Sequence, residues 1–285
     1  MKKFFACLAV LCLATLLCSC GKKEATSEQV SQPSEKKAAQ TIVDKIKAAG
    51  KMTVYTNPEF PPYEYLGANK TVVGAEIDIV NRIAEKLGVK AEIVSAEFDS
   101  IIGVIQAQKA DLGASGFTIT EERGKLVTFS IPFVDSVQYI IIPEDSPIKV
   151  VEDLAGKKIG GQNGTTGFLI CEDAINKGLL KGTGAEMKSY NTAPDAVVAM
   201  KNGRVDAVVI DELVAVSLAK KNPGYQAIPL VNREGAGLME VEKFGMIVAK
   251  GNEALLDVVN ATITEMQADG SLAEAILAHT EASSK

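Results

Sequence analysis

The spacing of apolar residues along the chain predicts helices and strands in alternation from residue 41 onward. Ile79, Ile83 and Leu87 recur at helical spacing just before Gly88, which predicts a helix over residues 76–87. Further elements predicted in this half are helices at 41–49 and 100–109 and strands at 52–56, 70–74, 89–94 and from residue 110. Such alternation is typical of a mostly parallel sheet with helices on its faces.

Two stretches of the chain resemble each other and predict two lobes of similar construction. Residues 99–115 and 195–211 each contain an Asp-capped helix, a tight turn, an aspartate and a buried strand. The general sequence preferences of helices and strands account for part of this likeness. The second stretch follows a predicted strand and helix, at 158–161 and 168–177. The repeat places Ser115 and Asp211 at equivalent strand ends.

Two apolar stretches are predicted to cross between the lobes. Residues 136–142 leave the first lobe and residues 244–248 return to it, before closing helices that begin at 253 and 271. The predicted fold is therefore α/β, with two similar lobes, central mostly parallel sheets, two hinge strands and a ligand cleft between the lobes. The predicted boundaries are lobe 1 at 41–135 plus 245–285 and lobe 2 at 136–244.

The N-terminal segment is predicted to be removed or tethered rather than folded. Lys2 and Lys3 precede an apolar run, which is typical of a secretory signal. The run ends in Leu-Cys-Ser-Cys-Gly, which resembles a bacterial lipobox with Cys20 as the lipidated residue; an ordinary cleaved signal is the alternative. We therefore expect a lipoprotein signal peptide at 1–19 and a polar, disordered tether at 20–40. This predicts a palmitate-type lipid anchor, and we expect no other attachment to the membrane. The folded body is expected to be extracytoplasmic, at the bacterial membrane or in the periplasm.

Composition excludes several classes of function. A net charge of -6 and a pI near 5.1 argue against nucleic acid as a partner. The single histidine, His279, is expected to be exposed near the C-terminus, which argues against histidine triads and histidine-rich metal sites. Cys171 is the only cysteine beyond residue 20 and is expected in a helix core. We expect no cofactor and no metal.

The candidate chemistry lies where predicted strands end, because ligands bind at the carboxyl ends of strands in open α/β sheets. Gly116 lets a ligand approach the backbone. Arg123 can bind a carboxylate with two hydrogen bonds. An arginine at this position is also compatible with a solvated helix face. Asp211 suits an ammonium group. The candidate ligand-binding residues are Asn57, Phe60, Phe98, Ser115, Gly116, Thr118, Arg123, Gln162, Thr165, Thr166 and Asp211.

Each candidate has a structural alternative. Phe60 and Phe98 suit either the sides of an apolar ligand stem or plain core packing. Asp211 could simply cap the following helix. The glycines at 160–167 could form a phosphate loop, but the spacings of the Walker and dinucleotide-binding motifs are absent from this sequence.

Several blocks of the sequence resemble the polar-amino-acid family of bacterial extracellular solute-binding proteins, the capture components of ABC importers. The resemblance covers about residues 51–277. The blocks are G-A-E-I-D-I-V-N-R-I-A-E-K-L at 74–87, F-D-S-I-I at 98–102, T-I-T-E-E-R at 118–123, G-T-T at 164–166 and V-D-A-V-V-I-D at 205–211. Ala75 departs from the family pattern, where a larger residue is usual, and this affects packing rather than binding.

The resemblance implies roles for individual residues. Arg123, Thr118 and Thr166 would hold the α-carboxylate of an amino acid, and Asp211 its α-ammonium group. Phe60 and Phe98 would form an aromatic shelf, with Asn57 and Gln162 nearer the ligand side chain. An amide at Asn57 makes a strongly basic ligand less favoured, although Glu59 keeps that option open.

The function expected from this resemblance is capture of a polar L-amino acid by hinge closure and its delivery to a membrane permease. The partners would be the ABC permease and its ATPase subunits, with the protein itself a monomer and not an enzyme. One alternative is a periplasmic cyclohexadienyl dehydratase-like enzyme on the same fold, for which Glu59 is the only free carboxylate to propose. Another is a binding protein that reports ligand to a separate receptor.

Overall fold

The computed structural model describes residues 41–284. The signal peptide predicted at 1–19, the lipidation predicted at Cys20 and the tether predicted at 20–40 lie outside these residues. None of the helices in the described range is long and apolar enough to cross a membrane.

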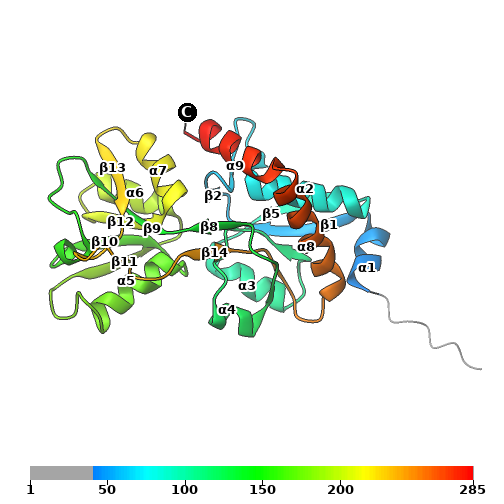
Figure 1. The fold of residues 1–285 in the computed structure, drawn as a ribbon, viewed down its shortest axis with the longest axis horizontal. Coiled ribbons are helices and arrows are strands. Elements are labelled where there is room, and N and C mark those ends of the chain that lie inside the picture. Colours follow the sequence, from blue (N-terminus) through cyan, green and yellow to red (C-terminus); the bar gives the residue numbers. More distant parts are fainter. Residues whose placement is uncertain (1–40, 285) are drawn as a thin grey trace, which may run out of the picture. The chain divides into compact units, whose positions relative to one another are not determined.

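Each of the two lobes is built on a five-stranded sheet of the same design (Figure 1). The first sheet has the order β5 (Lys90–Ser95), β1 (Lys51–Thr56), β6 (Leu112–Gly113), β15 (Ile247–Val248) and β7 (Thr128–Phe129). The second has the order β11 (Glu186–Tyr190), β10 (Lys158–Gln162), β12 (Ala207–Asp211), β9 (Gln138–Pro143) and β13 (Tyr225–Pro229). In both, the first three strands are parallel and the fourth is antiparallel to its neighbours. The predicted fold class is confirmed.

The predicted internal repeat corresponds to equivalent parts of the two sheets. β6 and β12 are each the third strand of their sheet, and each follows a helix, α3 (Phe98–Gln106) or α6 (Ala193–Lys201). Ser115 therefore follows the end of one third strand, and Asp211 ends the other. In both lobes the chain beyond this strand faces the same inter-lobe region.

The crossing strands pair with each other. β8 (Val134–Ser136) and β14 (Glu242–Phe244) are antiparallel, with Glu242 opposite Ser136. β8 continues after one residue into β9, and β14 leads to β15, so each crossing supplies the antiparallel fourth strand of one sheet. The lobe boundaries predicted at residues 135/136 and 244/245 stay a prediction.

Helices cover both sheets. The first lobe carries α1 (Ile42–Ala49), α2 (Ala75–Leu87), α3, α4 (Glu121–Leu126), α8 (Glu253–Ala268) and α9 (Ser271–Ala282). The second carries the 3-10 helix η1 (Val151–Leu154), α5 (Thr166–Asn176), α6 and α7 (Glu212–Lys220). A small antiparallel sheet of β2 (Glu59–Phe60), β3 (Glu64–Leu66) and β4 (Val72–Val73) lies in the first half of the chain.

Local sequence explains where most elements begin and end. Thr41 and Asp44 form a capping box at the start of α1, and Gly50 ends that helix in the left-handed conformation. The helix predicted from residue 100 instead begins at Phe98, and Glu97, the residue in the capping position, makes no side-chain cap bond. β11 and β13 were not predicted, since their residues are mostly exposed or half-buried and lack an apolar run.

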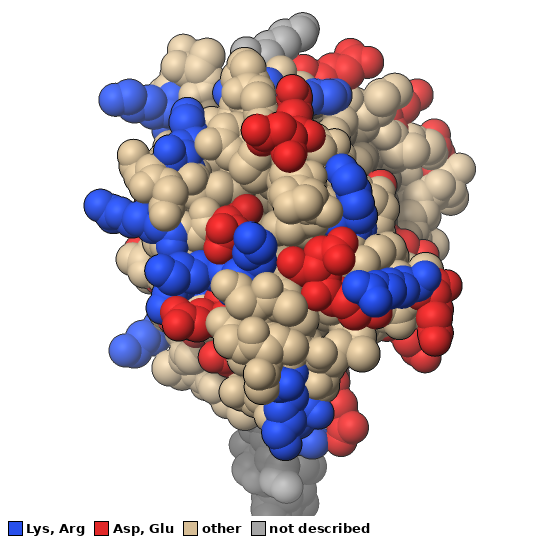
Figure 2. Space-filling view, turned by 90° about the vertical axis from the view of Figure 1, so that its left-hand side faces the viewer, with Lys and Arg blue, Asp and Glu red and all other residues tan. Residues whose placement is uncertain are grey.

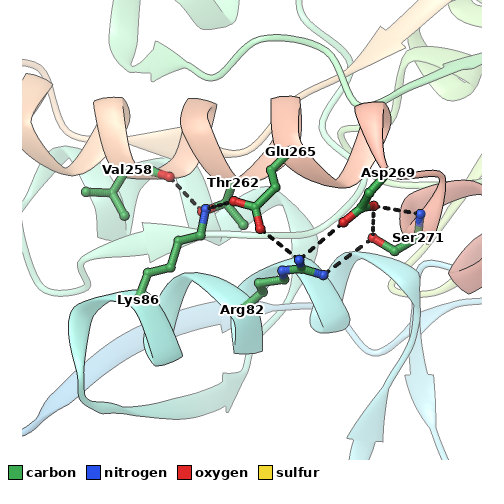
Figure 3. A network of polar contacts seen from close by, with 7 residues as sticks. All are labelled: Arg82, Lys86, Val258, Thr262, Glu265, Asp269 and Ser271. Carbon is green, nitrogen blue, oxygen red and sulfur yellow. Dashed lines mark hydrogen bonds and ion pairs between the residues drawn. The ribbon is translucent and has the colours of Figure 1, made fainter.

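Helix α2 packs on α8 through apolar residues flanked by charges. Ile79 and Ile83 of α2 and Val259 and Ile263 of α8 are completely buried members of one core cluster. Figure 3 shows the polar flank, where Arg82 bridges Glu265 and Asp269 at 2.8 and 3.2 Å. Because these ion pairs are partly exposed, the buried aliphatic contacts supply most of the stabilisation.

The expectation that His279 is exposed is wrong. Its imidazole lies 3.0 Å from the Tyr65 hydroxyl and 3.0 Å from Asp78, and its side chain is only 19% exposed. These contacts fasten α9 to the first lobe. The next turn of chain reaches the second lobe, where the Ser217 hydroxyl of α7 donates to the carbonyl oxygen of Ser283 at 3.0 Å.

Surface charge is mixed rather than concentrated on the face shown in Figure 2, which is the second-lobe end of the molecule. Lys and Arg side chains lie between Asp and Glu side chains across this face. Ion pairs such as Lys177–Asp173 and Lys188–Glu186 contribute to this pattern in the second lobe. This face therefore lacks the concentrated basic charge that nucleic-acid binding rewards.

We predict that Gly74→Ala destabilises the protein by roughly 3–5 kcal/mol. Gly74 precedes α2 at φ 144°, and a Cβ atom there would lie 2.0 Å from the carbonyl oxygen of Tyr63. Urea unfolding measures the change. Gly103→Ala is the control, since Gly103 is an exposed position in α3 with open space around it, and it should stabilise by up to about 1 kcal/mol. Equal stability of the two variants would contradict the prediction.

Candidate functional site

One pocket gathers all the candidate ligand-binding residues. It takes its walls from both lobes. The lining residues are Asn57, Phe60, Phe98, Ser115, Gly116, Thr118, Arg123, Gln162, Thr165, Thr166 and Asp211. Each of them is buried. Their proximity is a structural finding, while their role in binding stays a prediction.

Arg123 is the cation of this pocket. Thr120 caps α4, and the guanidinium turns inward, where Nη1 donates to the Thr118 carbonyl at 2.8 Å and Nη2 to the Gly164 carbonyl at 3.0 Å. It lies 5.5 Å from the centre of the Phe98 ring. The alternative of a solvated helix face is wrong, because Arg123 is only 8% exposed. Two of its five N–H groups are engaged, so others remain to hold a carboxylate.

The pKa of Arg123 shows what surrounds this cation. Burial lowers the pKa of the guanidinium, and the negative charges of Glu242 and Asp211 oppose that shift. A guanidinium remains protonated under any physiological condition, so the buried charge must be balanced by nearby anions.

The start of α5 faces the same end of the pocket. Thr165 is its capping residue, accepting from the N–H of Phe168 at 3.2 Å and donating to the Gln162 carbonyl at 2.8 Å. The Thr166 hydroxyl lies 3.4 Å from that of Thr118. The first N–H groups of a helix have no acceptor within the helix and favour an anion.

Asp211 is the carboxyl group at the other end. It ends β12 and is 3% exposed, and its Oδ1 accepts from the Ser136 hydroxyl at 3.2 Å and from the Gln138 amide at 3.1 Å. It occupies the capping position of α7 without a side-chain cap bond, so the helix-cap alternative is wrong. Burial raises the pKa of Asp211 well above its usual value, and the neighbouring charge of Glu242 raises it further.

Gly116 and two aromatic rings form the walls. Gly116 has φ 56°, and a Cβ atom there would lie 2.5 Å from the Phe60 ring. Its N–H donates to Glu76 Oε2 at 2.7 Å. Phe60 also packs against Phe244, with ring centres 6.0 Å apart, and Phe98 stacks on Phe117 at 4.8 Å. Both phenylalanines are thus core residues that also line the pocket.

Two amides meet across the cleft. The Gln162 side chain donates to Asn57 Oδ1 at 3.0 Å, while the Asn57 side chain donates to the Ala96 carbonyl at 3.0 Å. The backbone N–H of Asn57 donates to the Ser115 hydroxyl at 3.0 Å. This end of the pocket therefore presents neutral polar groups rather than charges.

Glu59 does not join the site. It is half-buried and is not among the residues that line the pocket. Its pKa is raised, first by burial and then by Asp195. Among the described residues, no group of three or more His, Cys, Asp or Glu side chains is placed to hold a metal ion.

Sequence reasoning missed three buried carboxyl groups beside the pocket: Glu64, Glu76 and Glu242. Glu242 accepts a hydrogen bond from Thr118 at 3.0 Å. An available signal was the two-residue period of the strand that contains Phe244, since it puts Glu242 on the buried face with that phenylalanine. Glu64 follows a loop rather than a regular pattern, and no comparable signal marks it.

Comparison with known proteins decides the family. Residues 52–279 match the bacterial extracellular solute-binding proteins, family 3. The chain belongs to this family. The resemblance drawn from the sequence blocks is confirmed.

Individual relatives agree with this assignment. The chain is 29% identical to the L-cystine-binding protein TcyJ of Escherichia coli K12 over 82% of this chain and 84% of that protein. It is 31% identical to ABC transporter arginine-binding protein 1 of Escherichia coli K12 over 78% and 88%. Its structure is similar to that of an L-arginine-bound amino acid ABC transporter substrate-binding protein, AbpA, from Streptococcus pneumoniae. The TM-score is 0.77 and the identity 29%, over 85% of this chain and 99% of that one.

We predict that the buried pair Glu64 and Glu76 makes stability fall as pH rises. Burial raises the pKa of Glu64 well above its usual value and that of Glu76 to about 7, from 4.5 in the unfolded chain. The folded protein therefore holds protons that unfolding releases, and this stabilisation is lost as pH increases from 4.5 through about 7 and above.

Glu64→Gln removes up to one such proton. The free energy of unfolding should then fall less steeply with pH, by up to about 1.4 kcal/mol per pH unit. Urea unfolding at several pH values measures the slope. Glu85→Gln, an exposed position on α2, is the control and should leave the slope unchanged. A Glu64→Gln slope equal to that of the wild type would contradict the prediction.

Proposed function

We propose that the protein captures an L-amino acid as a zwitterion and delivers it to an ABC permease. The single observation that carries this proposal is the pair Arg123 and Asp211, a guanidinium and a carboxyl group almost completely buried in one pocket. Buried charges are costly unless they are paired. A zwitterion supplies a partner for each of them at once.

The proposed pose follows from the hydrogen-bonding groups that remain available. The ligand carboxylate would accept from Arg123 and from the N–H of Thr166, and also from the Thr118 hydroxyl once that hydroxyl turns away from Glu242. The ligand ammonium would donate to Asp211 and to the Ser115–Gly116 segment. Its aliphatic stem would lie between Phe60 and Phe98, and its side chain would point toward Asn57 and Gln162.

The choice among amino acids depends on the Asn57–Gln162 end of the pocket. Two neutral amides favour a polar side chain that can both donate and accept. The relatives are named for L-cystine and L-arginine, which share only the α-amino-acid group with each other. We therefore propose a polar L-amino acid and take L-cystine and L-arginine as the first probes.

Closure is proposed to occur about β8 and β14, with lobe 1 at 41–135 plus 245–285 and lobe 2 at 136–244. Hydrogen bonds that span the cleft would form on closing: Arg123 to Gly164, Gln162 to Asn57 and Asn163 to Asp99. The closed form would present both lobes to the permease and its ATPase subunits. We further propose that the protein acts as a monomer, held at the outer side of the bacterial membrane by a lipid (palmitate-type) on Cys20 after loss of the signal peptide.

We propose that the protein is not an enzyme. Its relatives are binding proteins. A dehydratase would need a free general acid or base in the cleft, and Glu59, the candidate for that role, is not among the residues lining the pocket.

We predict that one L-amino acid, or one chemical group of them, raises the thermal unfolding temperature of the protein. Each common L-amino acid and L-cystine is added singly to protein freed of co-purified ligand. A ligand at 100 times its dissociation constant adds about 2.7 kcal/mol of stability. If the unfolding temperature of the folded protein rises with none of them, the proposed function is contradicted.

Arg123→Ala should abolish the ligand-induced shift in that assay. Loss of a charge-assisted pair to the ligand carboxylate costs roughly 3–5 kcal/mol, at least a hundredfold in affinity. Lys125→Ala on the same helix, where Lys125 is exposed and paired with Glu121, should keep the shift. Wild-type affinity in Arg123→Ala would refute the assigned role of the arginine.

The dehydratase alternative predicts a different result. Incubation with prephenate should give no product, and the absorbance of the phenylpyruvate that such an enzyme would form measures this directly. Sustained turnover, lost in Glu59→Gln, would replace the binding function with the enzymatic one.

A further inference from the structure

Strand pairing fixes a second carboxyl group beside Asp211. Glu242 lies opposite Ser136 in the β14–β8 pair, and Asp211 lies opposite Gln138 in the β12–β9 pair. Ser136 and Gln138 are two residues apart in a nearly continuous extended segment, so their side chains lie on the same face. The register therefore brings Glu242 and Asp211 to one face of the crossing segment.

One amide group links the two carboxyl groups. The Gln138 side-chain nitrogen donates to Oδ1 of Asp211 at 3.1 Å and also to Oε2 of Glu242. The Thr118 hydroxyl donates to Oε1 of Glu242 at 3.0 Å. Asp211 and Glu242 are 3% and 2% exposed. Among the hydrogen bonds of the described residues, both bonds to Asp211 go to Oδ1 and none to Oδ2, and Asp211 is one of the residues that line the pocket.

The surroundings are too acidic for every carboxyl group to be ionised. The titratable and charged groups around Asp211 are Arg123 of α4, Tyr63, Glu64 of β3, Glu76 of α2, Glu212 of α7 and Glu242 of β14. Arg123 is the cation among them. Burial and then the charge of Glu242 raise the pKa of Asp211. Both oxygens of Glu242 accept hydrogen bonds, whereas both bonds to Asp211 go to Oδ1, so within this pair the proton of the ligand-free protein is assigned to Asp211.

We propose that Glu242 keeps a proton on Asp211 in the ligand-free cleft, and that the ammonium group of a bound amino acid displaces this proton. The inference rests on the proposed function. The ligand ammonium keeps its own three protons, the displaced proton passes to solvent, and no covalent bond other than that O–H bond changes. Glu242 is a positioning residue, since it acts on the ligand through the protonation of Asp211.

A consequence is that protons and ligand compete for the same carboxyl group. While Asp211 is protonated in the free protein, each increase of one pH unit should strengthen binding by up to about tenfold. Above the pKa of Asp211, affinity should become independent of pH. A neutral residue at position 242 should weaken the competition between protons and ligand, so that affinity depends less on pH.

The first experiment needs no ligand. The free energy of unfolding in urea is measured from about pH 5 to about pH 8 for the wild type, Glu242→Gln and Glu240→Gln. The raised pKa of Asp211 makes the free energy of unfolding fall as pH rises. In Glu242→Gln this fall should be shallower, by an amount that corresponds to at most one proton. Glu240→Gln changes an exposed carboxyl group two residues away and should match the wild type.

A Glu242→Gln slope equal to that of the wild type would overturn the inference. If Glu242→Gln does not fold, Asp211→Asn takes its place, because it removes the carboxyl group that holds the proton. Asp211→Asn should also make the free energy of unfolding fall less steeply with pH. A slope equal to that of the wild type in this variant would contradict the inference as well.

The second experiment follows the displaced proton. L-arginine and L-cystine, and then any other L-amino acid that shifts the unfolding temperature, are titrated calorimetrically in two buffers of different ionisation enthalpy. Wild-type protein should release up to one proton per ligand below the pKa of Asp211, and Glu242→Gln should release less. Wild-type binding without proton release anywhere from about pH 5 to about pH 8 would refute the displacement.

The two experiments separate this inference from the proposed function. If the wild type binds no L-amino acid, the proposed function and the ammonium displacement both fail, while the unfolding profiles still decide whether Glu242 holds a proton on Asp211. If binding occurs and the profiles of the wild type and Glu242→Gln coincide, the proposed function stands and the inference about Glu242 fails.

Discussion

The structure depends on the compensation of a buried guanidinium. Arg123 is almost completely enclosed, and it is bonded to a carbonyl group in each lobe, Thr118 in the first and Gly164 in the second. Removing a charge from water costs several kcal/mol, so the pocket around it must supply opposite charge and hydrogen-bond acceptors. The nearby carboxyl group of Glu242 supplies the charge, and Asp211 gives the site a negative end when it is ionised. Such a site suits a zwitterion better than it suits a simple acid or base.

The fold brings these charges together by repeating one design. Each lobe places a third strand at the centre of its sheet, with Ser115 just past the end of one and Asp211 at the end of the other. The two crossings add the antiparallel strand next to each third strand. Ser136 and Gln138 belong to a crossing and hydrogen-bond to Asp211. The proposed change in the angle between the lobes would therefore act on the hydrogen bonds of Asp211.

Much of this could be predicted from sequence, because strand ends are marked by period and by small or polar residues. Those signals located Gly116, Arg123 and Asp211 and grouped them with the aromatic walls. Sequence could not assign the partners of each group. The inward turn of Arg123, the absence of a cap bond from Asp211 and the link through Gln138 all depend on tertiary packing. His279 was misjudged because its position in the last helix gave no hint of Tyr65 and Asp78, which lie about 200 residues earlier along the chain. Glu242 was overlooked because the strand was assumed to begin at Phe244.

The central claim is that two buried, opposite charges hold the two charged groups of one amino acid. The most direct test alters the ligand rather than the protein. Calorimetric titration compares each L-amino acid that binds with its analogue lacking the α-carboxylate and its analogue lacking the α-ammonium group. The account predicts that either deletion weakens binding by at least about a hundredfold, because the Arg123 guanidinium is left without its partner in one case and the charge-assisted bonds from the ammonium to Asp211 are lost in the other. An analogue that lacks one of the two groups and still binds as tightly as the amino acid would contradict the account.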